Sequence, residues 1–371
     1  MNSEAARQVG DAAIARTVIG AAVALGLLGA GGVSAATLQE GGGAVRNGNI
    51  GYVLTHKVWS LYETAGAKTE CPQGFNDGPR EQFKQQYNDG KKRTIVEAQL
   101  KREAEEWHPS TTPEQFTFKE AQGNTSYGMN LDGKIGPNDF VSPDGQKGID
   151  NQLYRVIGCI SNYRTMGTIN HFEELFMRSY NDARVVIELS GVDNLVNDND
   201  VTVHFYRGSD GLLQDATGEG FIPGGTQNVD MRWGKEYIAQ AKGKIVDGVL
   251  TSEPIDTVRL PWMSTFGTSA YHVFRGLRVN LKVSQTGAEG MLAGYVDVDA
   301  FMHQLTTSWS THHQSYGQLS SPSEYRALRR LADGYPDPKT GENTAISSSV
   351  NVKFVQVFVQ HPESRQITAK K

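Results

Sequence analysis

The residues best suited to chemistry lie in a turn-rich, acidic segment between residues 123 and 150. Asn130, Asp132 and Asp139 come first, and Asp144 and Asp150 follow in a second acidic turn. Carboxylate and amide oxygens are the groups with which proteins hold calcium. Asp and Asn are also the residues that tight surface turns require. A cation site and a plain solvated turn are therefore both open at this point.

The stretch from Asn130 to Asp139 resembles the calcium loop of the EF-hand family over about a dozen residues. The resemblance implies that Asn130 and Asp132 bind the ion through side chains, Lys134 through its carbonyl oxygen, and Asp139 at the closing position. The first position of the loop falls on Gly128, which has no side-chain oxygen, and flanking helices are not evident. The resemblance therefore extends to the loop and not to the full EF-hand fold.

The second acidic turn, from Asp144 to Asp150, is expected to complete the same ion site. We expect one structural calcium ion that positions a helix over residues 151–163. The ligands predicted for this ion are Asn130, Asp132, Lys134, Asp139, Asp144 and Asp150.

A second group of reactive side chains comprises Asp297, Asp299, His303, His312 and His313. Imidazole and carboxylate ligands together suit zinc, but their spacing matches no H-E-x-x-H pattern. The sequence also lacks a G-x-S-x-G nucleophile elbow, a P-loop and a dinucleotide-binding glycine motif. This group supports only an alternative function, a secreted hydrolase acting on polysaccharide or ester with its site near Asp297–His313.

The chain has two cysteines, Cys71 and Cys159. In an exported protein such a pair indicates a disulfide, and a loop of this length stabilises a fold by roughly 4–5 kcal/mol in the chain-entropy model. A free thiol pair or a metal site are the alternatives, although the spacing fits no zinc finger.

Residues 1–36 have the layout of a secretory signal peptide. Arg7 and Arg16 precede an uncharged run from Thr17 to Ala36, which ends in small residues. An uncleaved membrane anchor is the alternative, since the run is near the length that spans a bilayer. We expect cleavage, a periplasmic or secreted location, and a flexible leader over residues 37–49.

Charge and composition narrow the classes of partner. The formal net charge is −5 and no basic stripe is present, so nucleic-acid binding is disfavoured. No later segment is apolar for long enough to cross a membrane, so no membrane contact is expected after cleavage. The 41 glycines favour a chain rich in turns and strands.

Hydrophobic periodicity predicts helices within residues 50–180 and strands from 181 to 361. Residues 50–62 fit a strand or a helix equally well. Helices are predicted over 151–163, 171–180, 300–305 and 323–332. Predicted strands are 184–190, 201–206, 229–233, 236–239, 244–246, 249–251, 256–260, 271–283, 291–298 and 351–359.

Many short strands and Gly-rich turns are typical of an antiparallel sandwich or barrel. Of these we expect an α+β protein, mainly an antiparallel β-sandwich or jelly-roll-like domain, preceded by the helical segment and its acidic loop. Residues 362–371 are expected to be a disordered tail. The function expected is that of an exported, soluble, non-catalytic binding or structural protein, stabilised by calcium. Its ligand or extracellular partner is not specified by the sequence.

Overall fold

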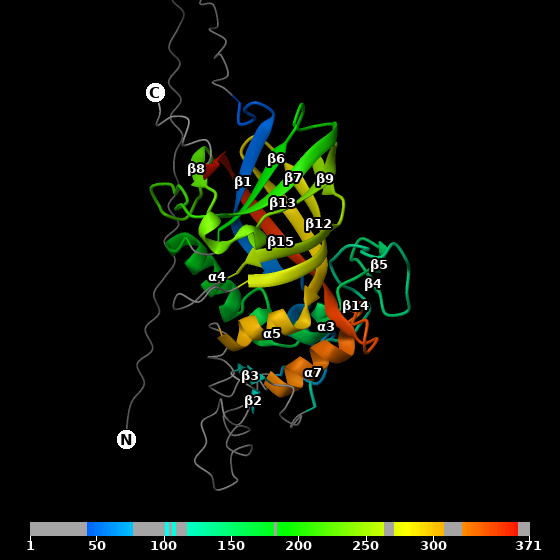
Figure 1. Cartoon of the computed structure of the whole chain (residues 1–371). Helices are drawn as coiled ribbons and strands as arrows, with labels where there is room; N and C mark the ends of the chain where they lie inside the picture. The colour runs from blue at the N-terminus through cyan, green and yellow to red at the C-terminus, as the bar shows by residue number, and fades with distance from the viewer. Residues whose placement is uncertain are drawn as a thin grey trace, which may run out of the picture. The chain divides into compact units, whose positions relative to one another are not determined.

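The computed structural model describes residues 43–76, 101–103, 106–108, 117–181, 184–262, 271–307 and 321–362. Within them, eight strands form a closed antiparallel barrel in the order β1-β6-β7-β9-β10-β12-β13-β15, which closes because β15 pairs with β1 (Figure 1). The strands are β1 (Asn49–Trp59), β6 (Arg184–Ser190), β7 (Asp198–Gly208), β9 (Ala239–Val246), β10 (Val249–Ser252), β12 (Tyr271–Val283), β13 (Gly287–Asp297) and β15 (Asn343–Gln360). The predicted signal peptide, most of the leader and residues 363–371 of the tail lie outside the described residues.

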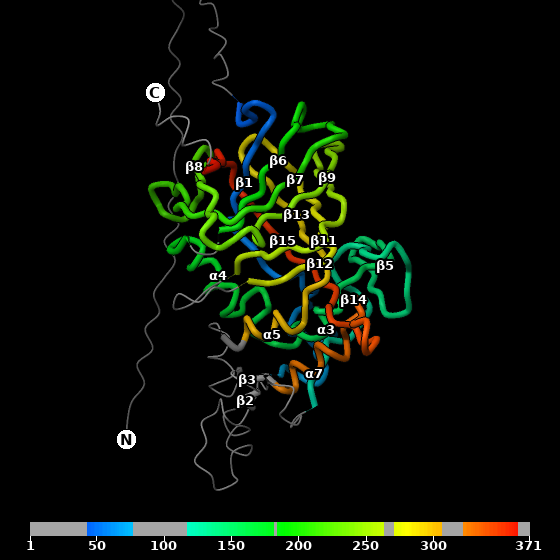
Figure 2. Tube along the Cα trace, viewed as in Figure 1, coloured from blue at the N-terminus to red at the C-terminus, as the bar shows by residue number. Residues whose placement is uncertain are grey.

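The predicted mainly antiparallel β structure is confirmed, but the two-sheet sandwich is wrong. A sandwich and a barrel share the same alternation of inward and outward residues, so periodicity alone does not separate them. Closure depends on β1, whose pattern fitted strand or helix equally well. Figure 2 shows β1 in blue beside β15 in red, joined by pairs such as Val53 with Val355. The barrel thus takes strands from both sides of the predicted boundary at residue 181.

Extra strands extend the barrel or lie outside it. They are β11 (Ile255–Pro261) on β12, β8 (Gly225–Asn228) parallel to β15, β14 (Gly334–Pro336) on β15, and the small pairs β2 (Lys101–Glu103) with β3 (Glu106–His108) and β4 (Phe140–Val141) with β5 (Lys147–Ile149). The strands predicted at 229–233 and 236–239 are wrong over most of their length, where the chain forms single 3-10 turns, η4 (Met231–Trp233) and η5 (Lys235–Tyr237). Gly234 between them has a positive φ, which interrupts extended structure.

The barrel interior is filled by apolar side chains that alternate with outward residues. On β6, Val185, Ile187 and Leu189 point into the main core, whereas Val186 and Glu188 point outward. Full burial of each such side chain contributes about 1.5–3 kcal/mol. The interior is therefore a packed core, and candidate binding surfaces have to be sought on the outer wall.

Helices gather at one end of the barrel (Figure 1). They are α3 (Leu153–Ile157), α4 (Thr168–Ser179), α5 (Val298–Thr307) and α7 (Ser321–Leu331), with the short 3-10 turns η1 (Ala65–Ala67) and η3 (Ser161–Tyr163). The helices predicted around 171–180, 300–305 and 323–332 are present, and the one predicted at 151–163 is split into α3 and η3. None of the described helices has the length and hydrophobicity needed to cross a bilayer.

A β-bulge at Thr55 changes which residues of β1 face inward. Pairing with β15 shifts between Leu54 and His56, so one extra residue enters the strand. Before the bulge Tyr52 and Leu54 are buried, and after it Lys57 is buried as well. A bulge re-aims side chains in this way without interrupting the sheet. It brings a lysine into the helix-covered end of the barrel.

The predicted disulfide is confirmed. Cys71 and Cys159 are bonded, with their Cα atoms 5.6 Å apart, inside the normal range. Cys159 lies between α3 and η3, so the bond ties the segment after η1 to the helical end of the molecule.

Candidate functional site

The side-chain oxygens of the predicted calcium loop are engaged within the loop. Asn130 accepts from the Gly133 amide at 2.6 Å, Asp132 from the Lys134 amide at 2.8 Å, and Asp139 from the Gly136 amide at 2.5 Å. The Lys134 carbonyl accepts from the Asn130 side chain. These are the local bonds with which Asn and Asp stabilise tight turns.

Asp150 and Asp144 hold different places in the same region. Asp150 is 6% exposed and accepts from the backbone amide of Leu131 at 2.6 Å, so it joins the two acidic turns. Burial raises the pKa of Asp150, and the nearby Asp132 and Asp139 carboxylates add to that rise. Asp144 instead bonds Ser142 in its own turn. Among the described residues no group of three or more His, Cys, Asp or Glu side chains is arranged to hold a metal, so calcium binding here stays a prediction.

Two aspartates of the alternative hydrolase group are engaged in other contacts. Asp297 pairs with Arg275 and accepts from the Ala300 amide at the start of α5. Asp299 accepts from the Tyr325 hydroxyl at 2.9 Å, which links α5 to α7. His303 is exposed, and His312 and His313 lie outside the described residues. Both aspartates thus have structural partners at the helical end of the barrel.

A buried ion pair lies where the bulge turns β1 inward. Lys57 Nζ is 2.7 Å from Glu173 Oε2 on α4, and both side chains are nearly inaccessible. The same Nζ lies 3.6 Å from the ring centroid of Trp262. Burial lowers the pKa of Lys57 and raises the pKa of Glu173, while each partner opposes the shift in the other. The pair fixes α4 against β1 in a water-free setting.

A second buried acid, Glu324, lies on α7, and neither of its carboxylate oxygens has a hydrogen-bond partner among the residues that the structure describes. It is 0% exposed, and burial raises its pKa to about 8. The carboxyl is therefore mainly protonated at neutral pH. These buried groups face packed core, so they serve the fold of the helical end.

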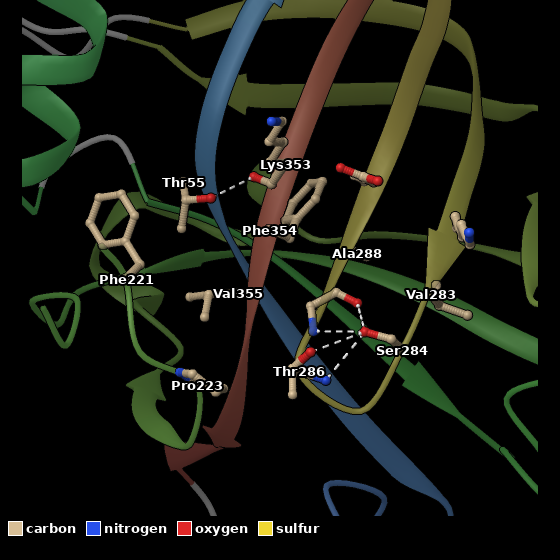
Figure 3. A pocket seen from close by; sticks show the side chains of 13 residues that line it. Thr55, Phe221, Pro223, Val283, Ser284, Thr286, Ala288, Lys353, Phe354 and Val355 are labelled. Carbon is tan, nitrogen blue, oxygen red and sulfur yellow. Dashed lines mark hydrogen bonds between the residues drawn. The ribbon is translucent and has the colours of Figure 1, made fainter. Parts of the chain in front are cut away.

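An open groove of about 510 Å³ lies on the outer wall of the barrel. It lies between the β12–β13 turn and a loop that we call the outer hairpin, residues 212–224. Figure 3 shows Phe221 and Pro223 of the outer hairpin on one side of β15, and Ser284 and Thr286 of the turn on the other. Val355 forms part of the apolar floor between them.

The outer hairpin is held in place by α4. Arg178 donates to the carbonyl oxygens of Gly218 at 2.8 Å and Glu219 at 2.6 Å, and its guanidinium lies 5.0 Å from the Phe221 ring centroid. Phe221 packs against an outer apolar cluster of Val53, Val186, Val355 and Val357. One wall of the groove is thereby fixed to the barrel.

The opposite wall is fixed by the turn that joins β12 to β13. The Ser284 hydroxyl donates to the Gly287 carbonyl at 2.9 Å, and the Tyr52 hydroxyl donates to the Ser284 carbonyl at 2.8 Å. At the bulge, Thr55 donates to the Lys353 carbonyl at 3.0 Å. The groove is therefore a preformed feature of the sheet.

A row of charges crosses the groove on three adjacent strands. The β-sheet register places Lys282 opposite Glu289, and Glu289 opposite Lys353. None of the three forms an ion pair with any residue that the structure describes. The row carries a net positive charge beside an apolar floor, and it leaves both ammonium groups accessible.

Sequence reasoning missed this groove. Lys282, Glu289 and Lys353 come from distant parts of the chain, and only the register of the closed barrel aligns them. The alternation of apolar and polar residues in β12 and β15 indicates which positions face outward. It does not show which strands pair with one another.

No model of a known protein family matches the chain, and neither a curated protein nor a solved structure matches it significantly.

Proposed function

We propose that this chain is an exported binding protein whose groove binds a small amphipathic anion without reacting with it. The observation that supports the proposal is the combination of an apolar wall with two accessible lysines in a preformed groove of about 510 Å³. That volume falls in the range of ordinary small-molecule sites. The groove lining contains no histidine or cysteine, which fits binding better than reaction.

In the proposed complex the apolar part of the ligand lies on Phe221, Pro223 and Val355. Its anionic group is held by Lys282 and Lys353, on either side of Glu289. Lysine ammonium groups bind a negative charge without demanding one fixed geometry. The site therefore selects for charge and apolar surface.

The test is a fluorescence titration with 8-anilinonaphthalene-1-sulfonate, an aromatic anion with both properties. Wild type is expected to show one saturable site. Lys282→Gln combined with Lys353→Gln is expected to raise the dissociation constant about two- to thirtyfold, because exposed charge pairs contribute about 0.2–1 kcal/mol each.

Lys244→Gln is the matched control, because Lys244 is an exposed lysine on β9 outside the groove. Its dissociation constant should equal that of wild type. Equal affinities in the double variant and the control would contradict binding in the groove.

A further inference from the structure

A serine and a histidine meet on the outer wall of the barrel, on the neighbouring strands β6 and β7. The oxygen Oγ of Ser190 lies 2.8 Å from Nε2 of His204. Both face outward because their neighbours Leu189 and Val203 fill the core. Both side chains are half-buried, so solvent and a small substrate reach them. This is the contact by which a histidine activates a hydroxyl nucleophile.

The histidine ring is oriented by further side chains. Gln240 on β9 lies opposite His204 in the sheet, and its interaction with the ring opposes the fall in the pKa of His204. Glu188 lies opposite His204 on the other side and is paired with His361 at 2.8 Å. Burial lowers the pKa of His204, so the ring is neutral at pH 7 and able to accept a proton. Nucleophile, base and orienting group therefore lie side by side on three strands.

A hollow of about 270 Å³ lies near this pair, and Glu188 of β6 lines it, whereas Ser190 and His204 do not. Asn49 lines the hollow and lies opposite Ser190 in the sheet. Arg46 lines it as well, with its guanidinium carbon 3.5 Å from the ring centroid of Phe358. Arg46 has no carboxylate partner among the described residues. A stacked guanidinium with open donors is a good receptor for a carboxylate.

We propose that Ser190 and His204 form a hydrolytic centre for small esters that carry a carboxylate. The Ser190 oxygen attacks the ester carbonyl, and its proton passes to Nε2 of His204. That proton then leaves with the alcohol as the C–O bond breaks, which gives an acyl-serine. Water, deprotonated by His204, cleaves the acyl-serine and releases the acid.

The neighbouring groups supply the remaining requirements of the reaction. The Asn49 amide and the Thr202 hydroxyl, both opposite Ser190 in the sheet, stabilise the negative oxygen of the tetrahedral intermediate. Arg46 holds the carboxylate of the substrate in the hollow. This centre is independent of the groove between the outer hairpin and the β12–β13 turn, so either proposal can fail alone.

The first experiment labels the full chain with a fluorophosphonate, which transfers a phosphonyl group to an activated serine and releases fluoride. Peptide mass mapping is expected to find the label on Ser190. Ser190→Ala should lose the label, and His204→Ala should slow labelling about a hundredfold or more. Ser209→Ala is the control, because Ser209 bonds a backbone carbonyl and no histidine.

Thermal unfolding of each variant shows whether it remains folded. Absence of label on Ser190 in the folded wild type would overturn the proposal. So would a rate that is unchanged in folded His204→Ala, since a merely structural serine does not depend on that base.

The second experiment tests the substrate class with p-nitrophenyl acetate and the p-nitrophenyl monoester of succinic acid. Arg46→Gln is expected to lower the ratio of kcat/KM for the succinate ester over the acetate ester about tenfold to a hundredfold. Arg259→Gln is the matched control, because Arg259 also lies over an aromatic ring, that of Tyr271. An equal ratio of kcat/KM values in both variants would contradict the binding of a substrate carboxylate by Arg46.

Discussion

Single residues decide which side chains reach the interior of this barrel. The extra residue at Thr55 places Lys57 inside, where it forms an ion pair with Glu173 and a cation–π contact with Trp262. Without that bulge the alternation would leave Lys57 facing outward, and an ordinary lysine on a strand would carry no buried partner. Glu324 is a contrasting case, because it is buried and its carboxylate oxygens have no partner in the described part of the chain.

Glu324 makes stability depend on pH in a defined direction. Its pKa is raised from 4.5 to about 8 in the folded protein. Between those values the unfolded chain ionises while the folded chain stays protonated, so the free energy of unfolding falls as pH rises. Glu324→Gln is expected to remove this loss, which gives a gain on the order of 4 kcal/mol at pH 8 and almost none near pH 4.

Urea unfolding at pH 4, 6 and 8 measures this effect. Glu219→Gln on the exposed outer hairpin should leave the pH dependence of stability unchanged. A gain from Glu324→Gln that is equal at all three pH values would mean that the Glu324 carboxyl is not protonated by burial.

At the scale of elements, strong alternation of apolar and polar residues predicted strands correctly, whereas turn-forming residues did not. The alternation over 271–283 and 351–359 correctly gave β12 and most of β15. Val229 to Trp233 has the composition of a strand, yet tertiary packing and Gly234 impose 3-10 turns there. The candidate sites depend on contacts between elements, such as Arg178 of α4 with the outer hairpin, which no local pattern encodes.

The Lys57–Glu173 pair is a buried contact between α4 and β1. Glu173→Gln is expected to lower the free energy of unfolding by about 3–5 kcal/mol, because it leaves a buried lysine without its counter-charge. Replacing both residues, Lys57→Met with Glu173→Leu, should cost clearly less than the sum of the single changes. A double-mutant cycle by denaturant unfolding measures the coupling, and additive effects would contradict an interacting pair.

For the whole molecule, composition and periodicity predicted an antiparallel β protein with a disulfide, and no more of its architecture. The strand candidates 184–190 and 201–206 became β6 and β7, but nothing in their sequence shows that the sheet closes. Closure is a long-range property, set by the pairing of β1 with β15. For the same reason the sequence did not reveal the groove or the contact of Ser190 with His204. The predicted calcium ligands lie near one another in the chain. The turns that they form are local structure, which the sequence can therefore indicate.

The disulfide acts on the whole molecule by restricting the unfolded chain. Cys71→Ala with Cys159→Ala is expected to lower the free energy of unfolding by roughly 4 kcal/mol in the chain-entropy model. Chemical denaturation of wild type and variant under oxidising conditions measures the loss, and added reductant should bring wild type close to the variant. A wild type that is insensitive to reductant, and as stable as the variant, would contradict this role.

The pairing of β1 with β15 also sets the order in which the chain can fold. These strands bracket nearly the whole barrel in sequence, so their contact closes a very long loop and is entropically costly early in folding. Hairpins such as β12–β13 can form first, while the pairing of β1 with β15 has to wait until β15 has left the ribosome. A chain released without β15 would expose open edges on both β1 and β13, which are templates for aggregation. Closure of the described barrel thus depends on β15.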